Sequence, residues 1–437
     1  MGDFTELHTA MTYSIDDISQ IINAERHGLC QATITTLLTD SRSLCFPQES
    51  LFFALQGARR DGHEYIGELY GHGVRNFVVS RLPEPMDSFP ECNFLLVRDT
   101  LQALQTLAAF HRARFSVPVV GITGSNGKTV IKEWLYQLLE PDRHVTRSPR
   151  SYNSQIGVPL SVWLMNEQTQ LGIFEAGISR KDEMPRLWKV ITPTIGVISN
   201  IGQAHQENFS SLQEKCIEKL KLFRGCDVII YDGDNTLIQD CVNKTVVTAR
   251  EIAWSRKNQE KPLFISKIEQ GQNSTLVEYR FIGLVGSYTI PFTDDASIEN
   301  SLNCLAVCLY LMMTPDTIAK RMATLEPLAM RLEVKDGKNG CIVINDSYSN
   351  DISSLGIALD FMARRAEGKK SGRTLILSDI LQSGLSNSEL YRRVAQLIEG
   401  RGIDKLIAIG TEIMQSQKRF AVREKHFFET TQEFLKS

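Results

Sequence analysis

Residues 117–140 read VPVVGITGSNGKTVIKEWLYQLLE, and this stretch decides the expected fold. It starts with a β-rich run at 117–122, continues into a glycine-containing loop, and then repeats apolar residues at helical spacing over 130–139. A strand, a glycine loop and a helix therefore follow one another. This order is typical of a unit in a parallel sheet whose loop and helix N-terminus hold a phosphate.

The loop itself has the residue types that bind a polyphosphate. Its backbone N–H groups can wrap the phosphates, Lys128 can reach the β and γ oxygens, and Thr129 can ligate Mg²⁺. The match to G-x-x-x-x-G-K-[ST] is imperfect, because five residues separate Gly121 from Gly127 and Ile122 stands where the first consensus glycine would be. A glycine turn without a ligand is the alternative, which the flanking strand and helix disfavour. The expected nucleotide-binding residues are Gly124, Ser125, Asn126, Gly127, Lys128 and Thr129.

Further candidate ligands follow the neighbouring strands. Glu175 lies at the end of the apolar strand LGIFEA, at the edge where parallel sheets bind ligands, and could hold magnesium. The segment NIGQAHQENF puts Asn200 and His205 at the same edge, although a loop histidine is more often structural than a ligand. Lys219 follows His205 by fourteen residues, in a lysine-rich helix that by itself is typical of a solvated face.

Three segments of different pattern divide the chain. Residues 1–112 mix short helical and strand-like runs and are expected to form a small α/β domain. Residues 113–325 contain the phosphate loop and further strands, which predicts a parallel-sheet nucleotide domain. Residues 326–437 alternate three strands, the first at 341–346, with helices, which predicts a Rossmann-like doubly wound domain. The expected fold class is thus α/β with three domains.

Composition excludes several classes of protein. The chain has 437 residues, with 48 Lys plus Arg against 51 Asp plus Glu, so it lacks the basic footprint of a nucleic-acid-binding protein. Its longest apolar stretch, at 304–313, is about half the length of a membrane-spanning helix. The acidic N-terminus is unlike a signal peptide. Nine cysteines without a C-x-x-C pair indicate neither a disulfide framework nor a thiolate zinc site, and the expected location is the cytoplasm.

Taken together, these segments resemble the Mur ligase family of ATP-dependent amide ligases, which build the peptide stem of the bacterial cell-wall precursor. GITGSNGKT is similar to the family's TG-x-NGKT loop, which also lacks the usual first glycine. The resemblance implies that Glu175 and His205 are metal ligands and that Lys219 is the family's carbamylated lysine. The implied nucleotide contacts are Asn300 on adenine, Arg331 at the start of the last domain, and Asp346 on the ribose.

The flanking segments indicate one branch of the family. TDSRSLCFPQESLFFALQGARRDGHEYI is similar to a UDP-binding N-terminal segment. SYNSQIGVPLSV is similar to the N-x-x-IG-x-P segment of the members that add D-alanyl-D-alanine to UDP-MurNAc-tripeptide. The members that add a diamino acid to UDP-MurNAc-dipeptide share the DSR element and are the nearest alternative, with folylpolyglutamate synthetase as a further one. The implied substrate-binding residues are Asp40, Ser41, Arg42, Asp61, Gly62, His63, Asn153 and Tyr348.

The chain departs from the family pattern in one loop of the last domain. Where the family has DSYNANP, residues 346–352 read DSYSNDI. Asp346 and Tyr348 carry over, whereas Ser349 and Asp351 do not. The contacts made by this loop are therefore left open.

The resemblance implies a reaction that activates a carboxylate. The γ-phosphoryl group of ATP moves to the terminal carboxylate of the tripeptide, and the amine of D-alanyl-D-alanine attacks the resulting acyl phosphate. Lys128 and two Mg²⁺ ions would offset the phosphoryl charge, and a carbamate on Lys219 would give the second metal an anionic oxygen ligand. Lys128, His205 and Lys219 are the expected catalytic residues.

Two other functions fit the sequence less well. A P-loop GTPase needs an N-K-x-D motif, but Asn243-Lys244 is followed by Thr-Val. An interaction scaffold that has lost its catalytic site would not need to retain the full set of candidate catalytic and metal-binding residues. That set consists of Lys128, Thr129, Glu175, His205 and Lys219.

The C-terminal end suggests a longer native protein. Relatives close the last domain with a further strand and a KGSR-like segment, and no such segment follows Asp379 here. The chain is similar to the ligase half of a fusion with a PLP-dependent alanine racemase, so we expect a racemase domain beyond Ser437. A natural short version with a smaller sheet is the alternative. No PLP-binding feature is recognised within the 437 residues.

Overall fold

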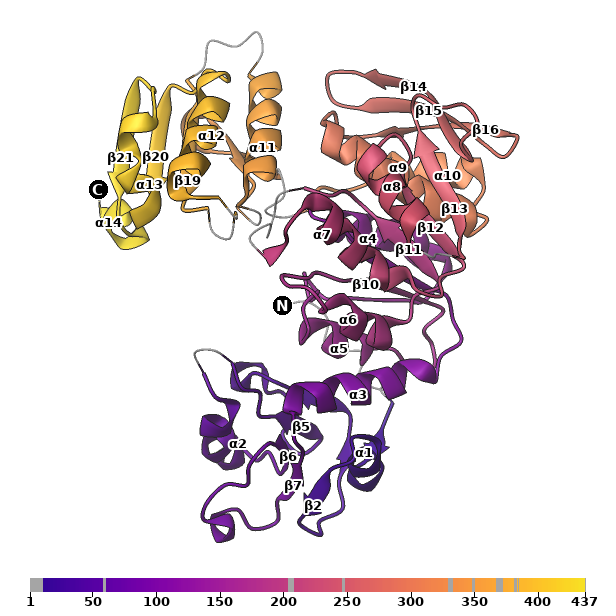
Figure 1. Cartoon of the computed structure of the whole chain (residues 1–437), viewed down its shortest axis with the longest axis vertical. Helices are drawn as coiled ribbons and strands as arrows, with labels where there is room; N and C mark the ends of the chain where they lie inside the picture. The colour runs from indigo at the N-terminus through magenta and orange to yellow at the C-terminus, as the bar shows by residue number, and fades with distance from the viewer. Residues whose placement is uncertain are drawn as a thin grey trace.

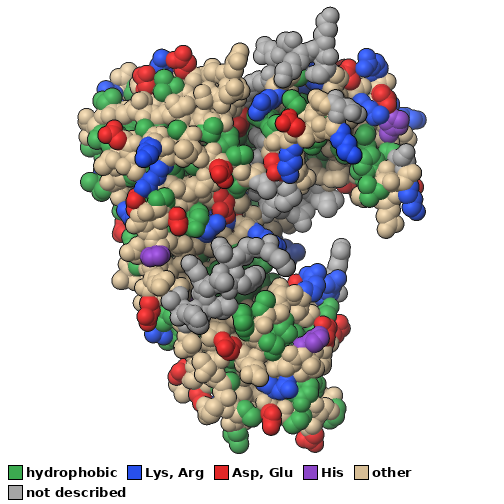
Figure 2. Space-filling view, turned by 180° about the vertical axis from the view of Figure 1, so that it is seen from behind, with side chains coloured by type: hydrophobic (Ala, Val, Ile, Leu, Met, Phe, Trp, Pro, Cys, Tyr) green, Lys and Arg blue, Asp and Glu red, His purple; other side chains and the backbone are tan. Residues whose placement is uncertain are grey.

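The chain folds into sheets with helices around them, arranged in a bent shape (Figure 1). The computed structural model describes residues 11–57, 60–202, 208–245, 248–328, 333–347, 350–366, 372–380, 383 and 385–436. The N-terminal and C-terminal parts lie at opposite ends of the bend, with the largest sheet between them. The molecular surface is hollowed between these two parts (Figure 2).

The N-terminal part is built on a five-stranded sheet of order β2-β7-β6-β5-β4, in which β4 to β7 are parallel and β2 is antiparallel. A short antiparallel pair, β1 and β3, lies apart from it. The long helix α3 begins where Asp99 accepts a hydrogen bond from the N–H of Gln102. The elements are β1 (Tyr13–Ser14), α1 (Ile15–Ile21), β2 (Glu25–His27), β3 (Thr33–Ile34), β4 (Thr36–Leu38), β5 (Ser50–Phe53), α2 (Ile66–Gly71), β6 (Asn76–Val79), β7 (Asn93–Leu96) and α3 (Thr100–Ala113).

The central part is built on a nine-stranded sheet of order β16-β15-β14-β13-β12-β11-β8-β10-β9. The strands from β9 to β14 in this order are parallel, and β14, β15 and β16 form antiparallel hairpins that the sequence analysis did not predict. Its strands are β8 (Val119–Thr123), β9 (Val145–Arg147), β10 (Leu171–Glu175), β11 (Ile195–Ile198), β12 (Val228–Asp232), β13 (Arg250–Ser255), β14 (Leu263–Gln270), β15 (Thr275–Phe281) and β16 (Leu284–Ile290).

Helices cover both faces of the central sheet, because apolar side chains alternate along its strands. Val120 and Ile122 of β8 face one hydrophobic core, which includes α4 and α9, whereas Val119 faces a second core with α6 and α7. No described helix combines the length and apolar character needed to cross a membrane. The helices are α4 (Lys128–Leu139), α5 (Gly157–Val162), α6 (Met184–Ile191), α7 (Leu212–Leu220), α8 (Thr236–Lys244), α9 (Asp295–Tyr310) and α10 (Pro315–Met322).

Strand order places the phosphate loop at a ligand-binding position. β8 lies between β10 and β11, which the chain adds on opposite sides of it. In open α/β sheets, ligands bind at such a switch point, outside the carboxyl ends of the strands. Glu175 of β10 pairs in register with Ile122, and Ile198 of β11 pairs with Thr123. The residues that follow these three strands therefore meet.

The C-terminal part contains a three-stranded parallel sheet of order β19-β20-β21 and a separate antiparallel pair, β17 and β18. Helices α11 and α12 contribute to its hydrophobic core. The elements are β17 (Glu333–Asp336), β18 (Ile342–Asn345), α11 (Ile352–Arg365), β19 (Thr374–Ser378), α12 (Asn387–Glu399), β20 (Lys405–Ile409), α13 (Thr411–Gln415), β21 (Glu424–Phe428) and α14 (Thr431–Lys436).

One strand of this part differs from the expectation. The run at 341–346 was expected in the doubly wound sheet, but β18 pairs with β17 instead. A tight turn accounts for the hairpin, because the N–H of Gly337 donates to the carbonyl of Cys341 at 2.7 Å and Gly340 has a φ of +73°. The local hairpin with β17 is the only pairing of β18 among the described residues.

A buried polar and aromatic cluster joins the N-terminal and central parts. His111 of α3 accepts a hydrogen bond at Nδ1 from the Tyr13 hydroxyl at 2.8 Å and donates from Nε2 to the Met165 carbonyl at 2.9 Å. The Trp163 ring lies 4.7 Å from the imidazole, centroid to centroid, and its Nε1 donates to the Thr35 carbonyl. Burial lowers the pKa of His111 to about 4, so this joint holds a neutral histidine.

We expect the free energy of unfolding to decrease as the pH falls from about 6.5 to about 4. His111 titrates near its ordinary pKa of 6.5 in the unfolded chain but near 4 in the fold, so in this window the unfolded chain binds more protons. The loss should reach about 3 kcal/mol and be complete below the lower value. Urea denaturation across this window measures it. His111→Gln should flatten the dependence and the exposed control His72→Gln should keep it; the same slope in both variants would contradict the assignment.

Candidate functional site

Two glycines allow the phosphate loop to approach its neighbours closely. Gly124 has a φ of +141° and Gly127 a φ of +83°, both in the region that favours glycine. A Cβ on Gly124 would lie 2.0 Å from Oγ of Ser199, and one on Gly127 would lie 2.4 Å from Oδ1 of Asn300. Any side chain at either position would push the loop away from β11 or from α9.

The loop is fastened to the segment that follows β11. The N–H of Ser125 donates to the carbonyl of Asn200 at 2.8 Å, and the N–H of Asn126 donates to its side-chain Oδ1 at 2.9 Å. The N–H of Gly202 donates to Oγ of Ser125 at 2.8 Å. The N–H groups of Ser125 and Asn126 are therefore used inside the protein, so an anion would be held by the later residues of the loop, where α4 begins.

Three lysines converge on the backbone of these two loops. Lys128 and Lys219 each donate from Nζ to the carbonyl of Gly124 at 3.0 Å, although Lys219 comes from α7. Lys215, one turn earlier in α7, donates to the carbonyl of Gly202 at 2.7 Å. The structure thus brings together Lys128 and Lys219, as expected, and adds Lys215, which the sequence analysis did not single out.

Two of these lysines, Lys215 and Lys219, are buried, and burial changes their pKa. Burial lowers the pKa of Lys219 well below its ordinary value, and the charges of Lys128 and Lys215 lower it further. Burial also lowers the pKa of Lys215 to about 8. The pattern-based expectation of a solvated face on this helix is wrong, because Lys215, Glu218 and Lys219 are all buried. Lys215 and Lys219 face the two loops, whereas Glu218 accepts a hydrogen bond from the N–H of Met184 at the start of α6.

Glu175 provides a buried carboxylate beside the start of α4. Its side chain is fully buried at the end of β10. Oε2 accepts hydrogen bonds from Oγ1 of Thr129 at 3.0 Å and from Nδ2 of Asn153 at 3.4 Å, and Oε1 lies 3.5 Å from Nζ of Lys132. The hydroxyl of Ser151 lies 3.0 Å from that of Thr129. The expected metal residues Thr129 and Glu175 are therefore neighbours, and Asn153 joins them.

The donors in this group suit a hard divalent cation. A carboxylate and a hydroxyl offer the oxygen ligands that Mg²⁺ prefers. His205, the further expected ligand, lies outside the described residues. Within the described ranges, no group of three His, Cys, Asp or Glu side chains gathers to hold a metal. A magnesium ion here would accordingly depend on phosphate oxygens as well as on Thr129 and Glu175.

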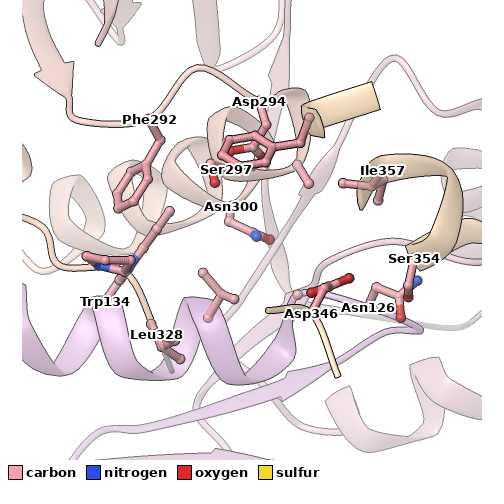
Figure 3. A pocket seen from close by; sticks show the side chains of 15 residues that line it. Asn126, Trp134, Phe292, Asp294, Ser297, Asn300, Leu328, Asp346, Ser354 and Ile357 are labelled. Carbon is pink, nitrogen blue, oxygen red and sulfur yellow. The ribbon is translucent and has the colours of Figure 1, made fainter. Parts of the chain in front are cut away.

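An apolar pocket opens on one side of the phosphate loop (Figure 3). The rings of Trp134 and Phe292 are stacked with centroids 4.9 Å apart and form part of its wall. Asn300 and Asp346 project into the same cavity, although they come from different parts of the chain. Arg331 lies outside the described residues. Sequence reasoning missed the two aromatic residues, because Trp134 fits the helical core pattern and Phe292 follows an unpredicted hairpin.

A second pocket lies on the other side of the same loop. It reaches α3 at Leu101 and includes Asn153 and Glu183. Lys128 and Lys219 line this second pocket together with Gly124 and Ser125, whereas Asn126 and Gly127 line the first. The phosphate loop is therefore a common wall between two cavities. The remaining residues of the second pocket are Ser154, Gln155, Ile156, Gly177, Ile178 and Ser179.

The expected substrate residues Asp40, Ser41 and Arg42 form a short turn after β4. Oδ1 of Asp40 accepts from the N–H of Arg42 at 3.0 Å, and the Arg42 guanidinium pairs with Oδ2 at 2.6 Å. This guanidinium lowers the pKa of the Asp40 carboxyl. The Arg42 side chain is 80% exposed, so it is accessible to a ligand.

Asp61, Gly62 and His63 form a second such turn. Oδ1 of Asp61 lies 2.7 Å from Nδ1 of His63, and the N–H of Ser80 donates to Nε2 at 3.1 Å, so Nδ1 carries the proton and donates to Asp61. Burial raises the pKa of Asp61, but hydrogen bonds from His63 and Arg81 outweigh it and hold the pKa well below its ordinary value. A Cβ on Gly62 would lie 2.7 Å from the Leu55 nitrogen, which explains the glycine.

The altered loop of the last part makes contacts of its own. Asn350 donates from Nδ2 to Oγ of Ser378 at 2.9 Å and to the carbonyl of Asp379 at 2.8 Å. Asp351 accepts hydrogen bonds from the N–H and hydroxyl of Ser354 at the start of α11. Tyr348 and Ser349 lie outside the described residues. The changed residues therefore fasten this loop to β19 and α11.

Comparisons with known proteins agree on one family. A family model described as the Mur ligase middle domain matches residues 122–308. A UDP-N-acetylmuramoyl-tripeptide–D-alanyl-D-alanine ligase of Bacillus subtilis is 30% identical over 388 residues, which are 87% of this chain and 81% of the relative. The crystal structure of MurF from Acinetobacter baumannii has a TM-score of 0.83 at 22% identity and covers 98% of this chain and 92% of that one. A MurF ligase from Thermotoga maritima, solved with ADP, has a TM-score of 0.72 at 20% identity, with 91% and 94% covered.

Replacement of Lys128 by Ala should decrease turnover at least 100-fold and leave the free energy of unfolding nearly unchanged. The ammonium lies on the loop between the two pockets rather than in a hydrophobic core, so its loss removes charge that would stabilise a transferring phosphoryl group. Phosphate release and urea denaturation measure the two quantities. Lys181→Ala, which changes an exposed lysine paired with Glu214, is the control. Retention of a tenth of the wild-type rate in Lys128→Ala would contradict the phosphate-binding role.

Proposed function

The chain belongs to the Mur ligase family, and we propose that it joins D-alanyl-D-alanine to UDP-N-acetylmuramoyl-tripeptide with hydrolysis of ATP, in peptidoglycan precursor synthesis. The observation that supports this reaction best is the position of the phosphate loop between two pockets. One pocket has the stacked aromatic rings and polar side chains that suit a nucleoside. The other is lined by two lysines and reaches the N-terminal part, so a phosphoryl group would pass from one ligand to the other at the loop.

The family alternative is less well supported. A ligase that adds a diamino acid to UDP-MurNAc-dipeptide would share the loop and the buried glutamate. The relative that matches 87% of this chain is instead a D-alanyl-D-alanine ligase. A folylpolyglutamate synthetase would not account for the paired turns of Asp40 and Asp61 beside the N-terminal sheet.

In this proposal, each part of the chain has one task. Residues 1–112 bind the UDP portion, with the exposed Arg42 guanidinium available for a phosphate. Residues 113–325 bind ATP, with Asn300 at the base. Residues 326–437 contribute Asp346 to the nucleoside pocket, so the nucleotide is held between two parts of the chain. The polar ends of the two ligands then meet at Lys128 and Lys219.

The chemistry follows from the charges around the loop. Lys128 and the N-terminus of α4 stabilise the negative charge that shifts when the γ-phosphoryl group moves to the tripeptide carboxylate. The amine of D-alanyl-D-alanine then attacks the carbonyl carbon of the acyl phosphate, the amide bond forms, and phosphate leaves. Thr129 and Glu175 would hold Mg²⁺, which supplies further charge neutralisation, and two such ions are proposed. His205, Arg331 and Tyr348 keep their proposed roles as metal, nucleotide and substrate residues.

Lys219 is proposed to carry a carbamate. Carbon dioxide reacts with a neutral amine, and burial between Lys128 and Lys215 favours the neutral form of Lys219. The product is an anion, which would relieve repulsion among the three lysines and provide an oxygen ligand for a second metal ion.

Two further assignments accompany this function. We place the reaction in the cytoplasm, where ATP is available and where the nine free cysteines would remain reduced. The continuation into an alanine racemase domain stays a prediction of the sequence. No role for PLP is assigned to these residues.

The proposed activity predicts a specific substrate dependence. Phosphate release should require ATP, UDP-MurNAc-tripeptide and D-alanyl-D-alanine together. Replacing the dipeptide by D-alanine, or offering UDP-MurNAc-dipeptide with a diamino acid, should give less than about a tenth of that rate, because acyl transfer needs the matched nucleophile at the second pocket. Faster turnover with the second pair would contradict the assignment in favour of the tripeptide-forming members.

Carbamylation predicts a dependence on carbon dioxide. Activity should fall in buffer stripped of carbon dioxide and return on addition of bicarbonate. With ¹³C-bicarbonate, a carbamate resonance should be seen in the wild type and in Lys215→Met but be absent from Lys219→Met. The Lys215 variant is the matched control, because that lysine is also buried and lies one turn away. A carbamate signal that persists in Lys219→Met would place the modification elsewhere.

A further inference from the structure

A fully buried lysine lies beneath the phosphate loop. Lys132 follows Thr129 by three residues on α4, so the two side chains share a face of the helix. Its Nζ donates to the carbonyl of Ser148 at 2.7 Å and to that of Arg150, and it lies 3.0 Å from Oε1 of Glu133. A charge without solvent is costly unless oxygens surround it. These oxygen contacts therefore stabilise the buried ammonium group of Lys132.

The Lys132 ammonium also leaves the two carboxylate oxygens of Glu175 with different partners. Oε1 of Glu175 lies 3.5 Å from Nζ of Lys132. Oε2 accepts from the Thr129 hydroxyl at 3.0 Å and from Asn153 at 3.4 Å, and the Thr129 hydroxyl is farther from Oε1, at 3.4 Å. The carboxylate thus presents one oxygen to the cation beneath it and the other to the helix start, where the phosphates would lie.

Lys132 also holds the chain segment that faces Glu175. The two carbonyls that it binds belong to the segment 148–153, in which Arg150 has a φ of +49°. That segment places the Ser151 hydroxyl 3.0 Å from Thr129 and directs the Asn153 amide to Glu175. One buried charge therefore determines where the carboxylate and the segment facing it are held.

We propose that Lys132 is a positioning residue that keeps Oε1 of Glu175 occupied, limits Glu175 to a single metal-binding oxygen, and so makes the site select Mg²⁺ over Ca²⁺. The proposal rests on the proposed function of Thr129 and Glu175 as magnesium residues. Mg²⁺ binds a few single oxygens at short distance, whereas Ca²⁺ accepts more ligands and readily takes both oxygens of a carboxylate. A carboxylate with one oxygen already paired to an ammonium suits the smaller ion.

The test compares nucleotide affinity in the two cations, without relying on turnover. Isothermal titration calorimetry with ADP, at saturating Mg²⁺ or Ca²⁺, gives the ratio of dissociation constants. The wild type should bind ADP at least about tenfold more tightly with Mg²⁺. Lys132→Met and Lys132→Gln should reduce this ratio at least about fivefold, because Glu175 can then offer both oxygens. Glu133→Gln is the matched control: it removes another carboxylate from the same ammonium without touching Glu175, and should keep the ratio.

The outcomes separate this proposal from the magnesium assignment. If Glu175→Gln abolishes the Mg²⁺ effect but the Lys132 variants keep the wild-type ratio, the role of Lys132 is overturned and the assignment stands. If Glu175→Gln leaves the Mg²⁺ effect intact, the assignment itself is wrong. Lys132→Met/Glu175→Gln removes both buried charges and should recover stability lost in Lys132→Met, as urea denaturation would show.

A structural measurement covers the case in which neither Lys132 variant folds. Crystals of the wild type with Mn²⁺ and ADP would locate the metal by anomalous scattering. Glu175 bound through Oε2 alone, with Lys132 still on Oε1, supports the proposal. Glu175 bound through both oxygens overturns it.

Discussion

The close approach of the phosphate loop to the segment after β11 is the constraint on which the site depends. It requires that Gly124 carry no Cβ, since that atom would lie 2.0 Å from Oγ of Ser199. The approach directs the N–H groups of Ser125 and Asn126 to Asn200 and leaves the Gly124 carbonyl facing two lysines. A wider separation of the two loops would withdraw the carbonyl that Lys128 and Lys219 share. The order of β10, β8 and β11 in the sheet makes this meeting possible.

Much of the fold and part of the site follow from local sequence. The strand, loop and helix around Gly127 are encoded within about two dozen consecutive residues, so the phosphate loop was predictable. Glu175 was predictable because a polar residue at the end of an apolar strand in a parallel sheet lies at the ligand edge. In both cases, the position in space is determined by neighbours in the chain and by a general rule of sheet topology.

The remainder depends on contacts between distant residues. Trp134 and Phe292 stack although 158 positions separate them, because Phe292 lies on the connection between β16 and α9, and α9 packs against α4. Lys132 and Lys215 look like ordinary helical surface residues in the sequence, because burial of a lysine depends on oxygens supplied by other segments. The β17 and β18 hairpin was missed for the opposite reason, since a tight turn at Gly340 outweighed the strand and helix alternation that suggested a crossover.

The shared wall between the two pockets has a thermodynamic consequence. Asn126 and Gly127 line the apolar pocket, whereas Gly124 and Ser125 line the second pocket, and the four are consecutive residues of one tight loop. A ligand that displaces the loop on one side changes the free energy of binding on the other. Such coupling is reciprocal. If a ligand in one pocket changes the affinity of a ligand in the other pocket by some factor, the second ligand changes the affinity of the first by the same factor. The fold therefore links the occupancy of its two cavities before any bond is made or broken.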